Sequence, residues 1–241
     1  MEQNEIKITE IFKSLSGEGN PVGAPTTYIR FFGCNMNPIC TWCDTMYSVK
    51  EIDDSVQTVT LEEIVNTIVT LGAPHVCFTG GEPMLYLSKI KTIMELCALQ
   101  GDYTYHFETN GMICPDRETW LNDYDVHYAV SPKLHALDLK DGMHLKNDCG
   151  PYIGKLRKWC TMMKPKFYMK FVFEGPDTIA DINRLKRMMM GGLADVTIYL
   201  MPEGRTLDKK KWQEAAKYCI ENNWHFSPRL QVVIWDDKRG T

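Results

Sequence analysis

The stretch FFGCNMNPICTWCDT, residues 31–45, places Cys34, Cys40 and Cys43 in one short loop. Thiolates are soft ligands, so three of them together indicate an iron–sulfur cluster or a zinc site. A closed structural zinc site takes four protein ligands, whereas a cubane on three cysteines keeps one iron open to another ligand. The spacing alone leaves open a cluster, a zinc knuckle completed by a distant histidine, and reduced structural thiols.

A predicted strand, residues 26–32, leads into this loop. It is the first of six predicted strands, which alternate with helices along the chain. The strands are residues 26–32, 75–79, 103–108, 125–130, 166–173 and 196–200, and the helices are residues 60–71, 85–100, 178–190 and 207–222. Such alternation is typical of parallel βαβ units. We therefore expect an α/β fold, a partial β/α barrel of about six mainly parallel strands, because six are too few for a closed eight-stranded barrel.

In a sheet of this kind the active site lies at the carboxyl ends of the strands. The cysteine loop follows the first predicted strand, and Trp42, Asp44 and Thr45 accompany its cysteines, which favours the cluster over the two alternatives. Residues 132–164 show no clear pattern, and we interpret them as a lid or an insertion. The length fits one α/β domain, and we expect residues 1–241 to form it.

The composition limits the class of protein. With 241 residues, a net charge of −4, 44% hydrophobic residues and 24% charged residues, the chain fits a soluble globular enzyme. The charge gives no sign of nucleic-acid binding, and no apolar run is long enough to span a bilayer. The nine cysteines are mostly scattered singly, which argues against a disulfide framework. The polar, acidic first residues are unlike a signal peptide, so a cytoplasmic location is expected.

A second motif, TGGEP at residues 79–83, directly follows the second predicted strand. Two adjacent glycines let the backbone pass close to a ligand, and backbone groups there can meet a carboxylate or an amine. Taken alone, the motif would indicate a tight turn. Together with the cysteine loop after the preceding strand, it indicates a ligand site.

These two motifs, each after a strand and in this order, resemble those of the radical S-adenosylmethionine (SAM) enzymes. The resemblance implies a [4Fe–4S] cluster on the three cysteines, with its open iron bound to the amino and carboxylate groups of SAM. One electron from the cluster would then release a 5′-deoxyadenosyl radical. The cysteines are Cys34, Cys40 and Cys43, and the implied SAM contacts are Gly81, Glu82, Ser131, Pro132 and Lys133.

Further segments narrow the resemblance. They are LSGEG at 15–19, Arg30, CDT at 43–45, ETNG at 108–111, SPK at 131–133 and YLMP at 199–202. The ordered set is similar to the 7-carboxy-7-deazaguanine synthase family over nearly the whole chain. That family contracts the ring of 6-carboxy-5,6,7,8-tetrahydropterin, with loss of ammonia, on the route to queuosine-type deazaguanines. It also uses Mg²⁺, and Thr45 matches its Mg²⁺ ligand.

The same resemblance assigns substrate contacts, and several have plainer alternatives. Arg30 would fork onto the substrate carboxylate, although a surface salt bridge is the commoner fate of an arginine. Thr45 could instead cap a helix, and LSG could be a glycine-rich turn. The implied substrate residues are Leu15, Ser16, Gly17, Arg30, Thr79, Glu108 and Thr241, the last through a terminal carboxylate.

The partners expected are the pterin substrate, an electron donor such as flavodoxin or ferredoxin, and a second copy of the chain in a homodimer. One feature departs from the family, because five residues rather than three separate Cys34 from Cys40. Such an insert can bulge outward without moving the sulfurs. Two other functions remain open: an enzyme that makes a glycyl radical on a partner protein, and a metal-binding module without turnover. LSGEG, Arg30 and CDT favour the pterin.

Overall fold

The computed structural model describes residues 4–50, 54–137, 150–162, 166–189, 193–236 and 238–241. Over these residues the chain forms a nine-stranded sheet in the order β3-β1-β2-β4-β5-β6-β7-β8-β9. The strands are β1 (Glu5–Leu15), β2 (Pro25–Phe31), β3 (Gln57–Thr60), β4 (His75–Gly80), β5 (Thr104–Thr109), β6 (Asp125–Val130), β7 (Phe167–Phe173), β8 (Ile198–Pro202) and β9 (His225–Phe226). The strands from β2 to β9 in this order run parallel, whereas β1 is antiparallel to β2 and β3.

All six predicted strands are confirmed, as β2, β4, β5, β6, β7 and β8, and their parallel pairing forms the expected partial β/α barrel. The prediction lacks β1, β3 and β9. β3 and β9 are too short to show an alternating pattern. β1 is long, but many of its residues are polar and only partly buried, which hides its alternation. It extends the sheet beyond the strand that precedes the cysteine loop.

The helices are α1 (Leu61–Leu71), α2 (Leu87–Ala98), α3 (Gly150–Met162), α4 (Pro176–Met188), α5 (Lys209–Asn222) and α6 (Leu230–Trp235). Four of them, α1, α2, α4 and α5, are predicted to within a few residues. α1 begins as its sequence predicts, because Thr60 and Glu63 form a reciprocal capping box. On α1 and α2 the buried residues recur every three or four positions, so each helix packs one apolar stripe onto the sheet.

The interpretation of residues 132–164 as a lid or an insertion is wrong for α3. Leu156 and Trp159 of this helix are fully buried. The Trp159 ring packs against Tyr128 of β6 with centroids 5.1 Å apart, and its Nε1 donates a hydrogen bond to the carbonyl of Gly111 at 3.1 Å. α3 is therefore a structural helix of the barrel. Its Gly-Pro start obscures the helical pattern in the sequence, and residues 138–149 and 163–165 lie outside the described part of the chain.

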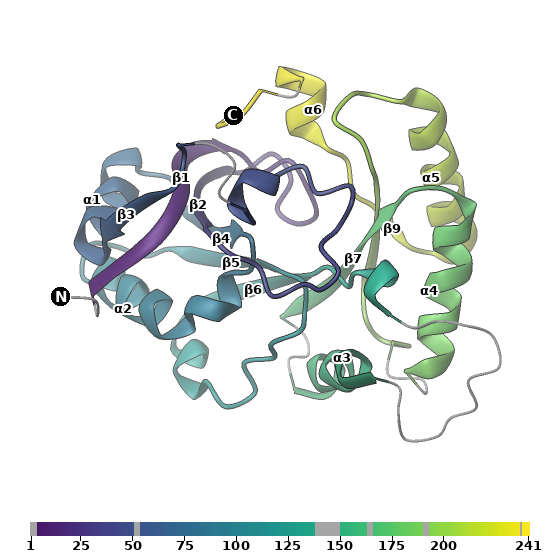
Figure 1. Cartoon of the computed structure of the whole chain (residues 1–241), viewed down its shortest axis with the longest axis horizontal. Coiled ribbons are helices and arrows are strands. Elements are labelled where there is room, and N and C mark those ends of the chain that lie inside the picture. Colours follow the sequence, from purple (N-terminus) through teal and green to yellow (C-terminus); the bar gives the residue numbers. More distant parts are fainter. Residues whose placement is uncertain (1–3, 51–53, 138–149, 163–165, 190–192, 237) are drawn as a thin grey trace.

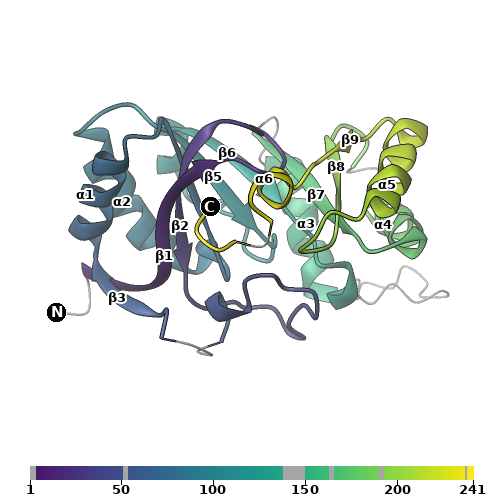
Figure 2. The same cartoon turned by 90° about the horizontal axis from the view of Figure 1, so that it is seen from above.

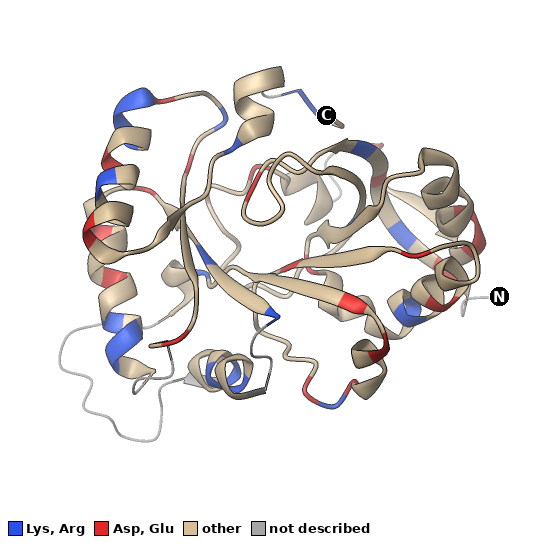
Figure 3. Cartoon of the chain, turned by 180° about the vertical axis from the view of Figure 1, so that it is seen from behind, with Lys and Arg blue, Asp and Glu red and all other residues tan. Residues whose placement is uncertain are grey.

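Helices α1 to α5 cover the outside of the sheet, whereas α6 lies near the C-terminus (Figures 1 and 2). α1 and α2 lie at one end, α4 and α5 lie at the other, and α3 lies between them. Acidic and basic residues are mixed along α4 and α5 (Figure 3), as expected for solvated outer faces. Within the described residues, no helix combines the length and the hydropathy needed to cross a bilayer. The end of the chain lies against the segment that follows β1, where Leu230 N donates to the Gly17 carbonyl at 2.9 Å.

Strand alternation decides which side chains face the inside of the barrel. In β5, Tyr105 and Phe107 are buried in the hydrophobic core, so His106 and Glu108 point to the opposite face. Arg30 of β2 pairs in register with Thr79 of β4, and Thr79 Oγ1 donates to a Glu108 carboxylate oxygen at 2.8 Å. Polar side chains of three neighbouring strands thus meet near their carboxyl ends.

Candidate active site

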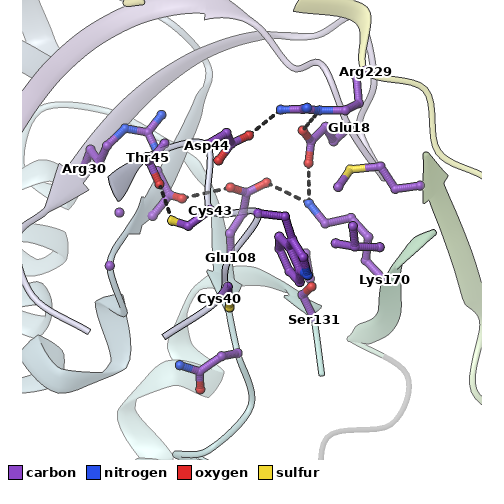
Figure 4. Close-up of a pocket in the computed structure, with 18 of the residues that line it drawn as sticks. Glu18, Arg30, Cys40, Cys43, Asp44, Thr45, Glu108, Ser131, Lys170 and Arg229 are labelled. Carbon is purple, nitrogen blue, oxygen red and sulfur yellow. Dashed lines mark hydrogen bonds and ion pairs between the residues drawn. The ribbon is translucent and has the colours of Figure 1, made fainter. Parts of the chain in front are cut away.

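A cavity of about 410 Å³ lies at the carboxyl ends of the parallel strands, and Figure 4 shows residues that line it. It is lined by every predicted site residue except Ser16, Glu82 and Pro132. Ser16 is buried and lines a smaller cavity instead. The fold therefore gathers segments from Leu15 to Thr241 around one space of a size that is usual for small-molecule sites.

Cys34, Cys40 and Cys43 all line this cavity, and each carries a free thiol. Burial raises the pKa of Cys34 and Cys40, that of Cys40 to about 11. Among the described residues, no three His, Cys, Asp or Glu side chains stand close enough to hold a single metal ion. Three thiols that line one cavity are the soft ligand set of an iron–sulfur cluster.

The insert between Cys34 and Cys40 does not simply bulge outward. Met36 is buried in the hydrophobic core, and Asn35 Oδ1 accepts a hydrogen bond from Asn110 Nδ2 at 2.8 Å. Only the middle of the insert, Asn37 and Pro38, is exposed. The insert is therefore anchored at the cavity and open to solvent at its tip.

The glycines of TGGEP let two backbones run in contact. A Cβ on Gly81 would lie 1.9 Å from the Gly33 carbonyl oxygen, and one on Gly80 would lie 2.2 Å from the Phe31 carbonyl oxygen. Two hydrogen bonds join these backbones. Gly81 N donates to the Phe31 carbonyl at 3.0 Å, and Glu82 N donates to the Gly33 carbonyl at 2.8 Å. The TGGEP loop is therefore fixed beside the residues that lead into Cys34.

Glu82 does not line the cavity, because its carboxylate turns toward the end of β5. It accepts hydrogen bonds from Thr109 Oγ1 at 2.7 Å, Asn110 N at 2.8 Å and Met84 N at 3.0 Å. The side chain is fully buried, and burial raises its pKa although these donors lower it. Glu82 thereby joins the TGGEP and ETNG loops, and Gly81 is the residue of this motif that faces the cavity.

The segment after β6 brings a cation to the cysteine loop. Lys133 Nζ donates to Ser131 Oγ at 2.9 Å and lies 5.2 Å from the centre of the Trp42 ring. Burial lowers the pKa of Lys133. The Lys133 backbone N–H also donates to Tyr152 of α3 at 2.9 Å, which fixes this turn from behind. Pro132, between these residues, shapes the turn without lining the cavity.

The plainer roles considered above, a helix cap for Thr45 and a salt bridge for Arg30, are present in part. Thr45 stands at the N-cap of a short 3₁₀ turn, Met46–Ser48, but its hydroxyl makes no capping bond and lies 3.7 Å from Cys43 Sγ. Arg30 Nε forms a salt bridge with Glu10 at 2.5 Å. Within the described residues, the two Nη groups of Arg30 have no hydrogen-bond partner, so one edge of the guanidinium is free to meet a ligand.

A network of charged side chains crosses the cavity, as Figure 4 shows, and sequence reasoning missed most of it. Lys170 of β7 contacts two carboxylates, Glu18 at 2.6 Å and Glu108 at 3.4 Å. Arg229 contacts Glu18 at 3.2 Å and also pairs with Asp44. Burial alone would raise the pKa of Glu18, but Lys170 and Arg229 lower it to about 2. Glu18 is therefore held as a carboxylate.

Signals for two of these residues exist in the sequence. Glu18 belongs to LSGEG. Lys170 stands between apolar residues in a predicted strand, where a lysine is unusual. Arg229 belongs to no motif. It reaches the cavity because the chain after β9 crosses back to LSGEG, where Gly19 N donates to Ser227 Oγ at 2.8 Å. The same return brings Thr241 to the cavity wall.

Comparisons with known proteins agree with this geometry. The Radical SAM superfamily profile matches residues 28–133, which include the cysteine, TGGEP, ETNG and SPK segments. The chain is 37% identical to the 7-carboxy-7-deazaguanine synthase of Clostridium acetobutylicum, over 97% of this chain and 98% of that one. It is 30% identical to the enzyme of Halobacterium salinarum, over 98% and 93% of the two chains.

Similarity of fold extends to a solved structure. The crystal structure of QueE from Escherichia coli aligns with a TM-score of 0.62, at 23% identity, over 92% of this chain and 93% of that one. The similarity to the two sequence relatives extends over 98% and 97% of this chain. On these grounds the chain belongs to the 7-carboxy-7-deazaguanine synthase family of radical SAM enzymes.

Proposed function

We propose that residues 1–241 form a single domain that converts 6-carboxy-5,6,7,8-tetrahydropterin into 7-carboxy-7-deazaguanine and ammonia. One observation carries the proposal: the cysteine loop, the TGGEP loop and the paired carboxylates Glu18 and Glu108 face the same cavity of about 410 Å³. A radical cofactor and a pterin need to meet in one space closed off from water. This cavity offers thiols on one side and charged hydrogen-bonding groups on the other.

The cofactor side is formed by the loops after β2, β4 and β6. Cys34, Cys40 and Cys43 would hold the [4Fe–4S] cluster. The residues that would bind SAM are Gly81, Ser131 and Lys133, with Glu82 and Pro132 shaping their loops. When bound, these groups supply the radical abstraction of hydrogen from C6 of the pterin. The Lys133 ammonium is the positive charge that would meet the SAM carboxylate, because Ser131 and Trp42 hold it at the cavity.

The substrate side is formed by the barrel interior. Arg30 would keep Nε on Glu10 and present its free edge to the pterin carboxylate. Glu18 and Glu108 would accept hydrogen bonds from the amino and ring N–H groups of the pyrimidine edge. Thr79, bonded to Glu108, would orient that carboxylate. The backbone of Leu15, Ser16 and Gly17 and the end of the chain at Thr241 would complete the enclosure.

Thr45 is the proposed Mg²⁺ ligand. Mg²⁺ prefers oxygen ligands and keeps several waters, so one hydroxyl together with substrate oxygens is a suitable set. The Thr45 hydroxyl lines the cavity and does not cap the following turn, which supports this role. Removal of Mg²⁺ with a chelator should slow product formation without removing iron.

The proposed partners are a flavodoxin or ferredoxin as electron donor and a second copy of the chain in a homodimer, in the cytoplasm. The exposed tip of the insert, Asn37 and Pro38, lies between the cluster cysteines and is a suitable contact for the donor. Native mass spectrometry would distinguish a dimer from a monomer. Reduction of the cluster by a flavodoxin, compared with dithionite, would test the donor.

The function is tested anaerobically. The reconstituted protein is mixed with SAM, dithionite, Mg²⁺ and 6-carboxytetrahydropterin, and products are followed by mass spectrometry. We expect 7-carboxy-7-deazaguanine. Cleavage of SAM without this product would contradict the substrate and leave radical chemistry in place. A glycyl radical on an added partner protein, or stoichiometric zinc without iron, would instead support an activating enzyme or a metal-binding module.

A further inference from the structure

A second, water-sized cavity lies beneath the active site. Its volume is about 20 Å³, and it shares two lining carboxylates, Glu18 and Glu108, with the large cavity. His106 and His127 also line it, as does Tyr168. A cavity of this size can hold one water molecule when polar groups surround it. We call it the floor chamber.

The register of the sheet places the histidines one layer below Glu108. His106 and Glu108 are two residues apart on β5, so their side chains share a face and their Cα atoms are about 7 Å apart. Cys77 of β4, His106 and His127 of β6 are directly paired across three strands. One layer further down are His75, Thr104 and Asp125. A polar column therefore runs from the active site to the amino ends of the strands.

Below Glu108, the side chains of this column contact one another. His75 Nδ1 and His106 Nε2 are 3.1 Å apart, which is a hydrogen bond whose donor depends on the tautomers. The His106 and His127 rings stack with centroids 5.4 Å apart. His127 Nε2 lies 3.1 Å from Asp125 Oδ1, and these two side chains are 40% and 59% exposed. The column thus opens to solvent at its lower end.

The reaction needs such a route for protons. Loss of ammonia from the contracted ring breaks one C–H bond and one C–N bond, and forms a carbon–carbon double bond. A carboxylate in the cavity takes the proton from carbon, and the amino group leaves as ammonium after it takes two protons from water. A base in the cavity must therefore exchange protons with solvent while bound ligands close the upper side.

We propose that the floor chamber and the histidines His106 and His75 form a proton path between Glu108 and solvent. A water in the chamber would bridge Glu108 and His106, and His106 would pass the proton to His75. A neutral imidazole can accept a proton on one nitrogen and release one from the other. This inference rests on the proposed function, because it concerns the protons of that reaction.

Two further observations support a transfer role over other uses of the histidines. Burial, together with His127 and His75, lowers the pKa of His106 to about 3, so the ring rests neutral and does not trap the proton. Within the described chain, these histidines and Asp125 form no group able to hold a metal ion. His106 does not reach the large cavity, so it is a relay residue rather than a catalytic one.

The test compares His106→Phe, which keeps a ring of similar size, with His225→Phe. His225 is an exposed histidine whose ring packs on Tyr199 at 4.9 Å, at the other end of the sheet. Product formation is measured in H₂O and in D₂O. His106→Phe should lower kcat at least about tenfold, leave KM for the pterin within about twofold, and raise the solvent isotope effect. His225→Phe should match the unchanged protein.

The possible results distinguish a failure of the proton path from a failure of the proposed function. Wild-type kcat and isotope effect in His106→Phe, or a loss no larger than in His225→Phe, would overturn the path. Absence of product in the unchanged protein would overturn the proposed function instead. If His106→Phe does not fold, His75→Phe decides, because His75 is only half-buried and its removal should shift the isotope effect in the same direction.

Discussion

Arg229 Nε donates to Glu18 Oε1 at 3.2 Å, joining residues 211 positions apart in the chain. The same guanidinium pairs with Asp44, which directly follows Cys43, and also bonds the carbonyl of Gly204. One side chain therefore links the proposed pterin loop, the cluster loop and the segment after β8. It thereby holds the substrate side of the cavity, at Glu18, against the cofactor side, at the cysteine loop.

Replacement of Arg229 by Gln should loosen the contact between the substrate side and the cofactor side of the cavity. A buried ion pair that loses one partner costs roughly 3 kcal/mol, because the remaining carboxylates stay desolvated. We expect a lower melting temperature and at least a tenfold loss in kcat/KM, mainly through KM for the pterin. The control is Lys217→Gln, which removes an exposed pair with Glu221 on α5 and should change neither quantity. An unaltered KM in Arg229→Gln would contradict the linking role.

Six strands of the parallel sheet could be predicted because each is rich in apolar, β-branched or aromatic residues and ends at a glycine, proline or polar turn. β1 could not, because its pairing with β2 is decided by tertiary contact and its residues are half polar. α3 starts with a glycine and a proline, and its helical character comes from burial of Leu156 and Trp159 against β6. Tertiary packing overrides weak local signals in both elements.

The cofactor side of the site was visible in the sequence because its residues are contiguous in short loops. The substrate side was visible only in part. Glu18 needs Lys170 and Arg229 to define its charge, and these three come from widely separated segments. Similarly, His75, His106 and His127 have no metal spacing in the sequence, and only the register of three parallel strands brings them together.

The cluster cysteines can be tested against a matched thiol. Cys34→Ser, Cys40→Ser and Cys43→Ser should each lose most of the iron and all SAM cleavage, since a hydroxyl is a poor ligand for this cluster. Cys114→Ser is the control, because Cys114 is also half-buried but does not line the cavity. Iron content and visible absorbance measure the outcome. Equal iron loss in the control would point to general instability.

The close approach of TGGEP to the cysteine strand predicts a steric effect at Gly81. In Gly81→Ala the new Cβ would overlap the Gly33 carbonyl at 1.9 Å, so the loop must move away from Cys34. We expect weaker SAM binding and a lower melting temperature. Gly154→Ala is the contrasting variant, since Gly154 is exposed on α3 and nothing lies within 4 Å of a Cβ placed there. It should gain about 0.5–1 kcal/mol from helix propensity. A Gly81→Ala protein that binds SAM normally would contradict the contact.

The burial of His106 predicts how the free energy of unfolding changes with pH. Its pKa falls from the ordinary 6.5 to about 3 in the folded protein, mainly through burial. Between these values the unfolded chain binds a proton that the folded chain does not, so stability decreases as pH falls from 6.5 toward 3. One such group contributes up to about 1.4 kcal/mol per pH unit. The urea unfolding midpoint, measured anaerobically from pH 7.5 to pH 5, should therefore fall less steeply in His106→Phe than in the unchanged protein. His225→Phe should keep the original slope, and an equal slope in all three proteins would show that His106 is not held neutral by the fold.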